Sequence, residues 1–516
     1  MASISLISGI VLLFITILYV SRRRRNPENR LTPPQPPRAW PILGHLHLLG
    51  GDDHTCFTFS RLADKHGPVF GLRLGFQNAV VISSREAVME AFTVRDKSFA
   101  NRPRNSSGEH LVYDSSAFGF ANGLYWRDMR KLVSSEVLSP RSIERRRNLR
   151  ALEMDLSIKE LHSLAVKNRN PVNLSQWTEQ MTLNIIVKTL AGKRYGRDPD
   201  GAVAEEVRRF RRLIGDITNL SGQFVLSDVI PFPLLKWVDS KGHIKKMKKV
   251  SKELDGILEE WIDEHLRRGK EVGDNEADFT DVLLSAIDER LEEIHGKTKM
   301  TIIKATIVNV ILGGFDTTSV FLLWALSLVV QHKEVMNLAQ KEIDSKIGKQ
   351  RWVQESDLNN LVYLQAIVKE TLRLYPPLPL SVPHQAVEDS QLCGYFIPKG
   401  TTLFVNLWKL HRDTRFWVDP EKFQPERFLS GQLLDVLGQQ YEYTPFGSGR
   451  RVCPGITFVA HVGNLTLARL IQGFDLATPG DRNVDMSVRF GVPIPRATPL
   501  EVIITPRLNS QLYEGL

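Results

Sequence analysis

One short segment, Pro445 to Gly455, holds the residues with the clearest chemical potential in this sequence. Its single thiol, Cys453, follows two glycines, which let the backbone take positive φ angles and lie close against a ligand face. Pro454 and the apolar residues after it are typical of the beginning of a helix, where free N–H groups favour a thiolate. A thiolate held in this way can ligate a haem iron and help to break the O–O bond of dioxygen. A buried structural cysteine is the alternative.

The residues around this thiol form an ordered pattern: Phe446, Gly447, Gly449, Arg451, Cys453 and Gly455. The pattern resembles the signature of the haem-thiolate monooxygenases, the cytochrome P-450 family. The resemblance implies haem b as the cofactor and Cys453 as the ligand of its iron. It also assigns cofactor-binding roles to four neighbours: Phe446, Gly447, Arg451 and Gly455. The implied fold is mainly α (α+β), a helix-rich domain with a small β-rich region, in which the haem lies between a long central helix and the cysteine loop.

A second group of reactive side chains lies inside the apolar stretch 301–331, which predicts one long helix buried through the protein. The helix is interrupted at Gly313 to Thr318, where Asp316 disfavours a second membrane span because a charge in a bilayer is costly. The interruption resembles the family's Ala/Gly-Gly-x-Asp-Thr-Thr. Splitting dioxygen requires two protons in a dry site, so we expect Asp316 to relay protons and the Thr317 hydroxyl to hold the bound oxygen and its water.

Three further residues resemble haem-binding positions of the family. Trp126 and Arg130 are four residues apart, on one face of a predicted helix, and match the family's Trp-x-x-x-Arg, whose side chains hold a haem propionate. His384 stands where the family often places another propionate-binding side chain, and a satisfied surface histidine is the alternative. The segments expected to line the cavity are 101–122, 378–383 and 490–495.

A charged triad is expected to shape the haem pocket without taking part in the chemistry. Glu370 and Arg373 are three residues apart on a helix that must end before Pro376. By themselves these two residues read as a surface ion pair. Their spacing, however, resembles the family's Glu-x-x-Arg, and Arg427 matches the downstream arginine that joins this pair in the family. The resemblance implies that the triad is buried, so that removal of one member leaves an uncompensated charge.

Composition restricts the environment and the partners of the chain. Its 516 residues are 42% hydrophobic, which is enough for a large core. The three cysteines are too few and too scattered for a disulfide framework, so a reducing compartment fits. A net charge of +9 suits a membrane surface or an acidic protein partner. No basic stripe interleaved with aromatic residues is present, so we expect no nucleic-acid partner.

The N-terminus predicts a membrane anchor. Residues 4–20 carry no charge and are followed by Arg22 to Arg25, and the run is at the short end of what spans a bilayer. A cleaved signal peptide would have its positive charge before the apolar run. The positive-inside rule leaves the rest of the chain in the cytosol. We therefore expect an anchor at 1–21, a basic and proline-rich linker at 22–45 and a catalytic domain at 46–516, on the endoplasmic reticulum membrane.

The pattern of the remaining chain predicts a few local structures. Residues 69–74 and 79–82 read as a β-hairpin around Gly75 to Asn78, and Ser84 is a candidate N-cap of the next helix. Residues 142–291 read as helical. An apolar, proline-containing break at 229–237, followed by lysines, predicts either a loop that dips into the lipid interface as a lid or an ordinary surface helix.

The motifs together resemble a plant microsomal member of the family that acts in specialised metabolism. The implied reaction inserts one oxygen atom of O2 into a C–H bond of a small apolar terpenoid, alkaloid or phenolic metabolite. Electrons are expected from NADPH through NADPH–cytochrome P-450 reductase, with cytochrome b5 as a possible second donor. A haem-thiolate isomerase or dehydratase and a non-catalytic haem-binding protein are the alternatives, and the Asp316–Thr317 pair disfavours both.

Overall fold

The structure of the chain is a computed structural model that describes residues 9, 12, 16, 30–49, 51, 53–167, 171–195, 202–223, 225–230, 239, 241–268, 277–429 and 435–516. The predicted anchor at 1–21, apart from isolated positions, lies outside these residues. So do the first part of the linker and residues 231–237 of the predicted lipid-facing loop. These predictions therefore remain predictions.

Helices dominate the described part of the chain. The α-helices are α2 (Thr55–His66), α3 (Arg85–Phe92), α4 (Ser106–Leu111), α5 (Gly123–Leu132), α6 (Pro140–Arg145), α7 (Arg147–Lys167), α8 (Leu174–Ala191), α9 (Ala202–Ser221), α10 (Leu226–Val229), α11 (His243–Arg268), α12 (Phe279–Ala286), α13 (Glu289–His295), α14 (Lys299–Gln331), α15 (Lys333–Lys346), α16 (Val362–Leu374), α17 (Leu407–Leu410), α18 (Ile456–Gly473) and α19 (Ser510–Glu514). Shorter helical turns are η1 (Leu46–Leu48), η2 (Val133–Val137), η5 (Glu355–Asn360), η6 (Pro425–Phe428), η7 (Gly449–Arg451) and η8 (Pro479–Asp481). The strands are β1 (Val69–Leu74), β2 (Gln77–Ile82), β3 (Val172–Asn173), β4 (His384–Gln385), β5 (Ser390–Leu392), β6 (Tyr395–Ile397), β7 (Thr402–Val405), β8 (Phe474–Ala477) and β9 (Glu501–Pro506).

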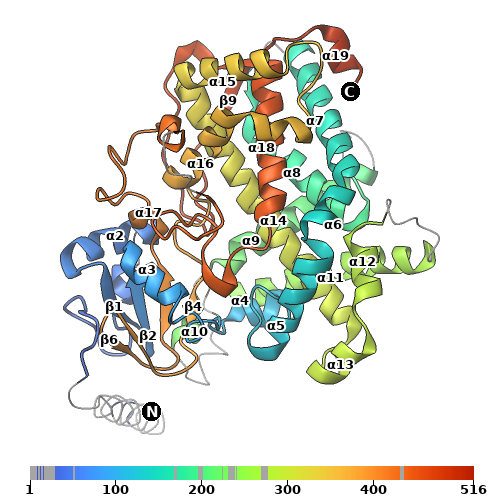
Figure 1. Cartoon of the computed structure of the whole chain (residues 1–516). Helices are drawn as coiled ribbons and strands as arrows, with labels where there is room; N and C mark the ends of the chain where they lie inside the picture. The colour runs from blue at the N-terminus through green and yellow to red at the C-terminus, as the bar shows by residue number, and fades with distance from the viewer. Residues whose placement is uncertain are drawn as a thin grey trace.

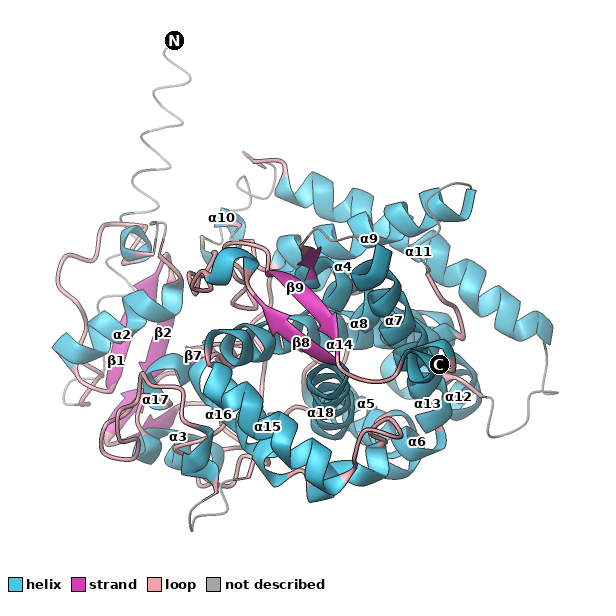
Figure 2. Ribbon diagram, turned by 90° about the horizontal axis from the view of Figure 1, so that it is seen from above, coloured by secondary structure: helices cyan, strands magenta, loops and turns pink. Residues whose placement is uncertain are grey.

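Helix α14 forms the centre of the helical part (Figures 1 and 2). It packs against α8, α16 and α18, and most of its side chains after Thr318 are buried. Thr298 caps its first turn by accepting a hydrogen bond from the Thr301 N–H. Among the described residues α14 is the one helix long and apolar enough to cross a membrane. Its packing instead makes it the core helix that the sequence predicts, although it runs through Gly313 and Gly314 without a break.

The sheet that contains β1 and β2 lies to one side of the helices in both views, whereas β8 and β9 lie among the helices (Figures 1 and 2). It is the largest sheet and has the strand order β1-β2-β7-β4, in which β2 and β7 are parallel and the other pairs are antiparallel. This sheet contains the predicted hairpin, with Val69 opposite Ile82. Its turn is shorter than predicted, because Gln77 and Asn78 already pair with β1 and only Gly75 and Phe76 remain between the strands.

Two segments differ from their sequence-based descriptions. Residues 101–122 read as a loop, yet they contain α4, whose N-terminus is capped when Asn105 accepts a hydrogen bond from the Gly108 N–H. Residues 142–291 read as helical apart from the break at 229–237, yet Val172 and Asn173 pair with β9 from the far end of the chain. Local periodicity does not reveal such a long-range pairing. The predicted cap Ser84 is confirmed, since its side chain accepts from the Ala87 N–H.

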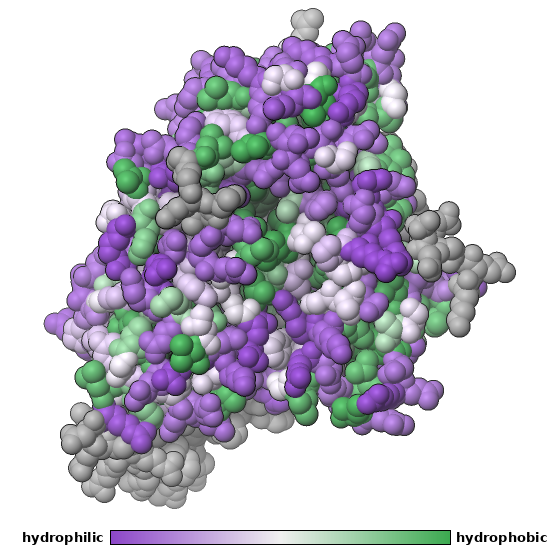
Figure 3. All heavy atoms as spheres, in the orientation of Figure 1, coloured by the Kyte–Doolittle hydropathy of each residue, from purple (hydrophilic) through white to green (hydrophobic). Residues whose placement is uncertain are grey.

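The described part of the predicted linker lies against the sheet. The Gly71 N–H donates to the Pro34 carbonyl at 2.9 Å, and the His45 ring bonds the Pro36 carbonyl at 2.9 Å. The proline-rich run therefore lies against β1. On the face shown in Figure 3, hydrophilic residues make up most of the surface and hydrophobic groups lie between them.

The charged triad joins α16 to η6. Arg373 donates to both Glu370 carboxylate oxygens, at 2.7 and 2.8 Å, and the Arg427 Nε donates to Glu370 Oε1 at 3.0 Å. Glu370 and Arg373 have no exposed surface. Arg373 also donates to the His411 and Pro420 carbonyls, so one buried guanidinium fixes two further chain segments. This network holds the chain before the cysteine loop in one geometry.

Replacement of Glu370 tests how much the fold depends on this network. In Glu370→Gln the two guanidiniums lose their carboxylate while they remain buried, so we expect a loss of about 3–5 kcal/mol in the free energy of unfolding. Urea and thermal unfolding of the purified protein measure it. The matched control is Glu144→Gln, which breaks an exposed ion pair with Arg147 and should cost less than about 1 kcal/mol. Equal midpoints for the two variants would contradict the assignment.

Candidate active site

A cavity of about 360 Å³ lies between α14 and the cysteine loop. Its walls come from the segments after α4 and before β4, from α8 and α9, and from the beginning of α18. Each of the three segments predicted to line it contributes residues: Phe118 to Phe120, Leu378 with Ser381 and Val382, and Val492 with Pro493. Phe490, in the last predicted segment, is instead 54% exposed.

The cysteine loop has the backbone that its glycines predict. Gly447 and Gly449 take φ angles of 75° and 69°, a region that side chains disfavour. The Cys453 N–H donates to the Phe446 carbonyl at 3.0 Å, which closes the loop. The Gly455 N–H donates to Cys453 Sγ at 3.4 Å, just before α18 begins. Burial raises the pKa of the Cys453 thiol, and the Gly455 N–H and Arg130 offset it in part. Metal coordination deprotonates such a thiol outright.

Three guanidinium groups, of Arg102, Arg130 and Arg451, gather on the wall beside this thiol. Arg102 donates to the Val382 and Pro383 carbonyls, each at 2.8 Å. Burial lowers the pKa of Arg102 and of Arg451, and the neighbouring guanidiniums lower both further. No salt bridge joins any of the three to a carboxylate in the described part of the chain. Their arrangement therefore fits an anionic ligand.

The guanidiniums are oriented by backbone and aromatic contacts. Arg130 donates to the Val452 carbonyl at 2.6 Å, next to the thiol. The Arg451 guanidinium lies 3.9 Å from the centre of the Trp126 ring and donates to the Ala100 and Ala121 carbonyls. Trp126 and Arg130 thus lie on the cavity side of α5, as their spacing predicts.

His384 is buried and lines the cavity, so the alternative of a surface histidine is wrong. Its Nδ1 lies 2.9 Å from the Phe99 carbonyl and donates to it. Burial and the nearby Arg102 hold the pKa of the imidazole well below its usual value, and the ring is neutral. A neutral ring that donates at Nδ1 keeps Nε2 as an acceptor. This group complements the cationic wall without adding to its charge.

Asp316 and Thr317 line the same cavity from α14. Thr317 Oγ1 donates to the Gly313 carbonyl at 2.6 Å, one turn back on the helix. Asp316 Oδ2 is buried without a hydrogen-bond partner among the described residues. Burial raises the pKa of Asp316 to about 6, which the Thr218 hydroxyl offsets only in part. A carboxyl group with this pKa exchanges protons readily near neutral pH.

The residues of the cavity fit haem b by their chemistry. One wall carries a thiol and three guanidiniums, which match the iron and the two propionates of the cofactor. The helix that also lines the cavity has no side chain at Gly313 and Gly314, and a Cβ at Gly313 would meet no atom within 4 Å. The haem, when bound, supplies the oxidation chemistry, and the protein supplies its orientation and its surroundings.

Arg102 and Asn309 are among the polar residues of this cavity that the sequence did not single out. Arg102 lies in the segment 101–122, whose overall role was predicted, but nothing in its local pattern separates it from Arg104 nearby. Asn309 lies two turns before the acid–alcohol pair, in a stretch that reads as apolar helix. The signal that indicates Asn309 is its spacing. It stands four residues before Gly313 and eight before Thr317, and residues at these intervals share one helix face.

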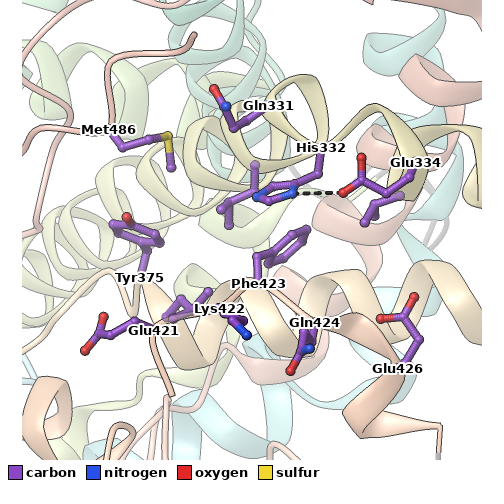
Figure 4. A pocket seen from close by; sticks show the side chains of 13 residues that line it. Gln331, His332, Glu334, Tyr375, Glu421, Lys422, Phe423, Gln424, Glu426 and Met486 are labelled. Atoms are coloured by element: carbon purple, nitrogen blue, oxygen red, sulfur yellow. Dashed lines mark hydrogen bonds and ion pairs between the residues drawn. The ribbon is translucent and has the colours of Figure 1, made fainter. Parts of the chain in front are cut away.

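A second cavity, of about 570 Å³, lies at the C-terminal ends of α14 and α16. Figure 4 shows Tyr375, Phe423 and Met486 around it and the pair of His332 and Glu334 at its edge. No cysteine among the described residues lines it, and its carboxylates Glu334, Glu421 and Glu426 are exposed. The side chains expected to act in the chemistry all line the cavity beside Cys453 instead.

Comparison with known proteins places the chain in one family. The family model of Cytochrome P450 matches residues 34–499. Vinorine hydroxylase of Rauvolfia serpentina is 48% identical, over 94% of this chain and 93% of its own length. A nicotine N-demethylase of Nicotiana tomentosiformis is 44% identical (98% and 99% covered), and flavonoid-6-hydroxylase of Ocimum basilicum is 43% identical (99% and 98% covered).

The fold agrees with that of solved family members. A zebra fish cytochrome P450, solved with progesterone, matches with a TM-score of 0.74 and 25% identity, over 88% of this chain and 99% of its own. The predicted mainly α fold and haem b cofactor are confirmed by these matches. The chain belongs to the cytochrome P450 family and is a haem-dependent monooxygenase, which takes electrons from a redox partner and acts on a small molecule.

Proposed function

We propose that this monooxygenase inserts one oxygen atom of O2 into a C–H bond of a small apolar plant specialised metabolite, an alkaloid, a terpenoid or a phenolic compound. The proposal rests on one observation: Cys453, Asp316 and Thr317 line the same largely apolar cavity. The relatives named above are hydroxylases and a demethylase of alkaloid and flavonoid compounds. Both outcomes begin with oxidation of a C–H bond.

Each of these residues has a separate task in the proposal. Cys453 would hold the iron, and the three guanidiniums of the wall would bind the propionates. His384 lines the cavity beside them, but its Nε2 is an acceptor and cannot donate to an ionised propionate. Asp316 takes protons from solvent and passes them toward the cavity, because its pKa of about 6 allows both steps near neutral pH. The Thr317 hydroxyl donates to the Gly313 carbonyl, so its oxygen is placed to accept a hydrogen bond from a water in the cavity. The apolar walls exclude bulk water.

The proposed electron donor is NADPH–cytochrome P-450 reductase, with cytochrome b5 as a second donor, at the surface of α5. Arg127 and Lys131 are exposed on this helix, while Trp126 and Arg130 face the cavity. Positive charge here attracts an acidic partner and speeds its association. Arg450 adds little net positive charge to this surface, because its Nε pairs with Asp96 at 2.7 Å.

The proposed location is the endoplasmic reticulum membrane, with a single span at 4–20 and the catalytic domain in the cytosol. The uncharged run and the arginines after it support this placement. The proline-rich run along β1 then connects the anchor to the sheet side of the domain.

Replacement of the proposed iron ligand is the first test. In Cys453→Ser we expect loss of the Soret band that reduced haem-thiolate proteins show with carbon monoxide, and loss of NADPH-dependent product formation, because a hydroxyl does not supply the thiolate. Cys393→Ser is the matched control, since this thiol does not line the cavity. Unchanged spectra in Cys453→Ser would falsify the proposal. Product formation from a peroxide without NADPH would instead identify an isomerase.

The proton relay has a pH signature. The protonated, donating form of Asp316 decreases as the pH rises through about 6, so the rate of NADPH-dependent oxidation should decrease over the same range if proton delivery limits it. In Asp316→Asn this inflection should vanish and the rate should drop roughly hundredfold. The exposed Asp481→Asn is the control. An inflection that persists in Asp316→Asn excludes Asp316 as the relay.

Charge reversal tests the partner surface. In the double variant Arg127→Glu, Lys131→Glu we expect the rate of haem reduction by the flavoprotein reductase to decrease roughly tenfold at low salt and the difference to shrink at high salt. Stopped-flow measurement with purified proteins gives this rate. The control is Lys248→Glu, Lys249→Glu on α11, which makes the same charge change on a helix that does not line the cavity. Equal rates for both variants would place the partner elsewhere.

A further inference from the structure

Asn309 differs from the other polar groups on α14 because it has hydrogen-bond donors that remain available to the cavity. It lines the cavity one turn before Gly313 and two turns before Thr317. Residues at this spacing lie on one face of a helix, so Asn309 and Thr317 face the same space about 12 Å apart along the axis.

The orientation of its amide is determined by the roof of the cavity. The Gly119 N–H donates to Asn309 Oδ1 at 2.8 Å. The approach is close, since a Cβ on Gly119 would lie 2.7 Å from that oxygen. A main-chain N–H needs an acceptor, so the oxygen and not the nitrogen of the amide faces Gly119. The Nδ2 group also lies near the roof, 3.5 Å from the position of a Cβ on Gly119, but its two N–H donors are not used by the Gly119 N–H.

The Nδ2 group donates to no atom of the described residues and is not among the buried side-chain atoms without a partner. Three other cavity-lining hydroxyls already donate to main-chain carbonyls: Thr189 to Ile185 at 2.7 Å, Ser221 to Thr218 at 2.8 Å and Thr317 to Gly313 at 2.6 Å. The Thr218 hydroxyl has no hydrogen-bond partner among the described residues, but its oxygen is buried and not presented to the cavity. Asn309 therefore offers a fixed donor in surroundings that are mostly apolar, where an unpaired polar group is costly.

We propose that Asn309 selects substrates that carry a neutral hydrogen-bond acceptor, such as a ketone or lactone carbonyl, and holds that acceptor away from the carbon that is oxidised. The inference rests on the proposed function and narrows it. An oxygenated phenolic or terpenoid skeleton fits such a donor. A protonated amine does not, because it would present donors to donors. Asn309 is a specificity residue here and takes no part in the oxidation.

A pair of ligands that differ only in the acceptor tests the proposal. Xanthone and xanthene share one tricyclic skeleton, and xanthene has a methylene group in place of the carbonyl. Dissociation constants come from difference spectra of the purified holoenzyme. In Asn309→Leu we expect the affinity for xanthone to decrease roughly three- to tenfold, the value of one hydrogen bond, with little change for xanthene. Comparing both ligands isolates the pairwise interaction.

Two variants separate selection from a structural role. Asn309→Asp at pH 8 keeps an acceptor for the Gly119 N–H and removes the donors, so it should also lose affinity selectively for xanthone. Ser221→Ala removes a cavity hydroxyl whose hydrogen is already engaged, and should change both affinities alike. An equal change for both ligands in both Asn309 variants, no change in either, or failure of the wild type to bind xanthone overturns the proposal. NADPH-dependent oxidation by the wild type separately decides the proposed function.

Discussion

The structure depends on main-chain carbonyls that accept hydrogen bonds from three guanidinium groups, of which Arg102 is buried and Arg130 and Arg451 are half-buried. A buried cation without partners is costly, and within the described residues none of Arg102, Arg130 and Arg451 has a carboxylate. Each donates instead to main-chain carbonyls, of the segment before β4, of the cysteine loop and of the roof, respectively. The same bonds that stabilise these charges therefore fix the three segments that surround the haem. The cationic wall is formed in advance, which lowers the cost of binding the cofactor.

Helix α14 places the reactive groups by its spacing alone. Asn309, Gly313 and Thr317 recur every four residues, so a donor, a gap and a hydroxyl share one face, and Asp316 lies beside them. The second half of the helix is almost wholly buried against α16 and α18. This packing holds the first half in place although two glycines weaken it. An acid whose pKa is raised by burial is possible here because the rigid helix keeps it in a dry site.

The sequence predicted best what lies in short motifs and worst what depends on contacts between distant segments. Short motifs restrict the backbone and the contacts that their residues can form. This holds for the cysteine loop, for the triad at Glu370 and for the hairpin at Val69. Arg102 was missed because its role arises from carbonyls some 280 residues away, at Val382 and Pro383. Helix α4 was missed because it depends on its N-cap, Asn105. Strand β3 was missed because it forms only by pairing with β9. The orientation of Asn309 follows from Gly119, which no periodicity connects to it.

The cavity therefore has two kinds of wall. This difference explains why a relative's reaction chemistry can be inferred for this chain more safely than its substrate. The wall around Cys453 is held by hydrogen bonds between backbone groups and a few arginines, and a change there disturbs cofactor binding for every substrate. Other parts of the wall, such as Ile186 and Leu190 on α8 and the segment at Val492, are apolar side chains that can change in size without breaking a backbone bond. Relatives that are 43% to 48% identical can thus keep one oxidation chemistry while their names give unlike substrates. In such a cavity a fixed donor such as Asn309 discriminates between ligands more sharply than the apolar walls, because an unmatched polar group costs more than a missing methylene.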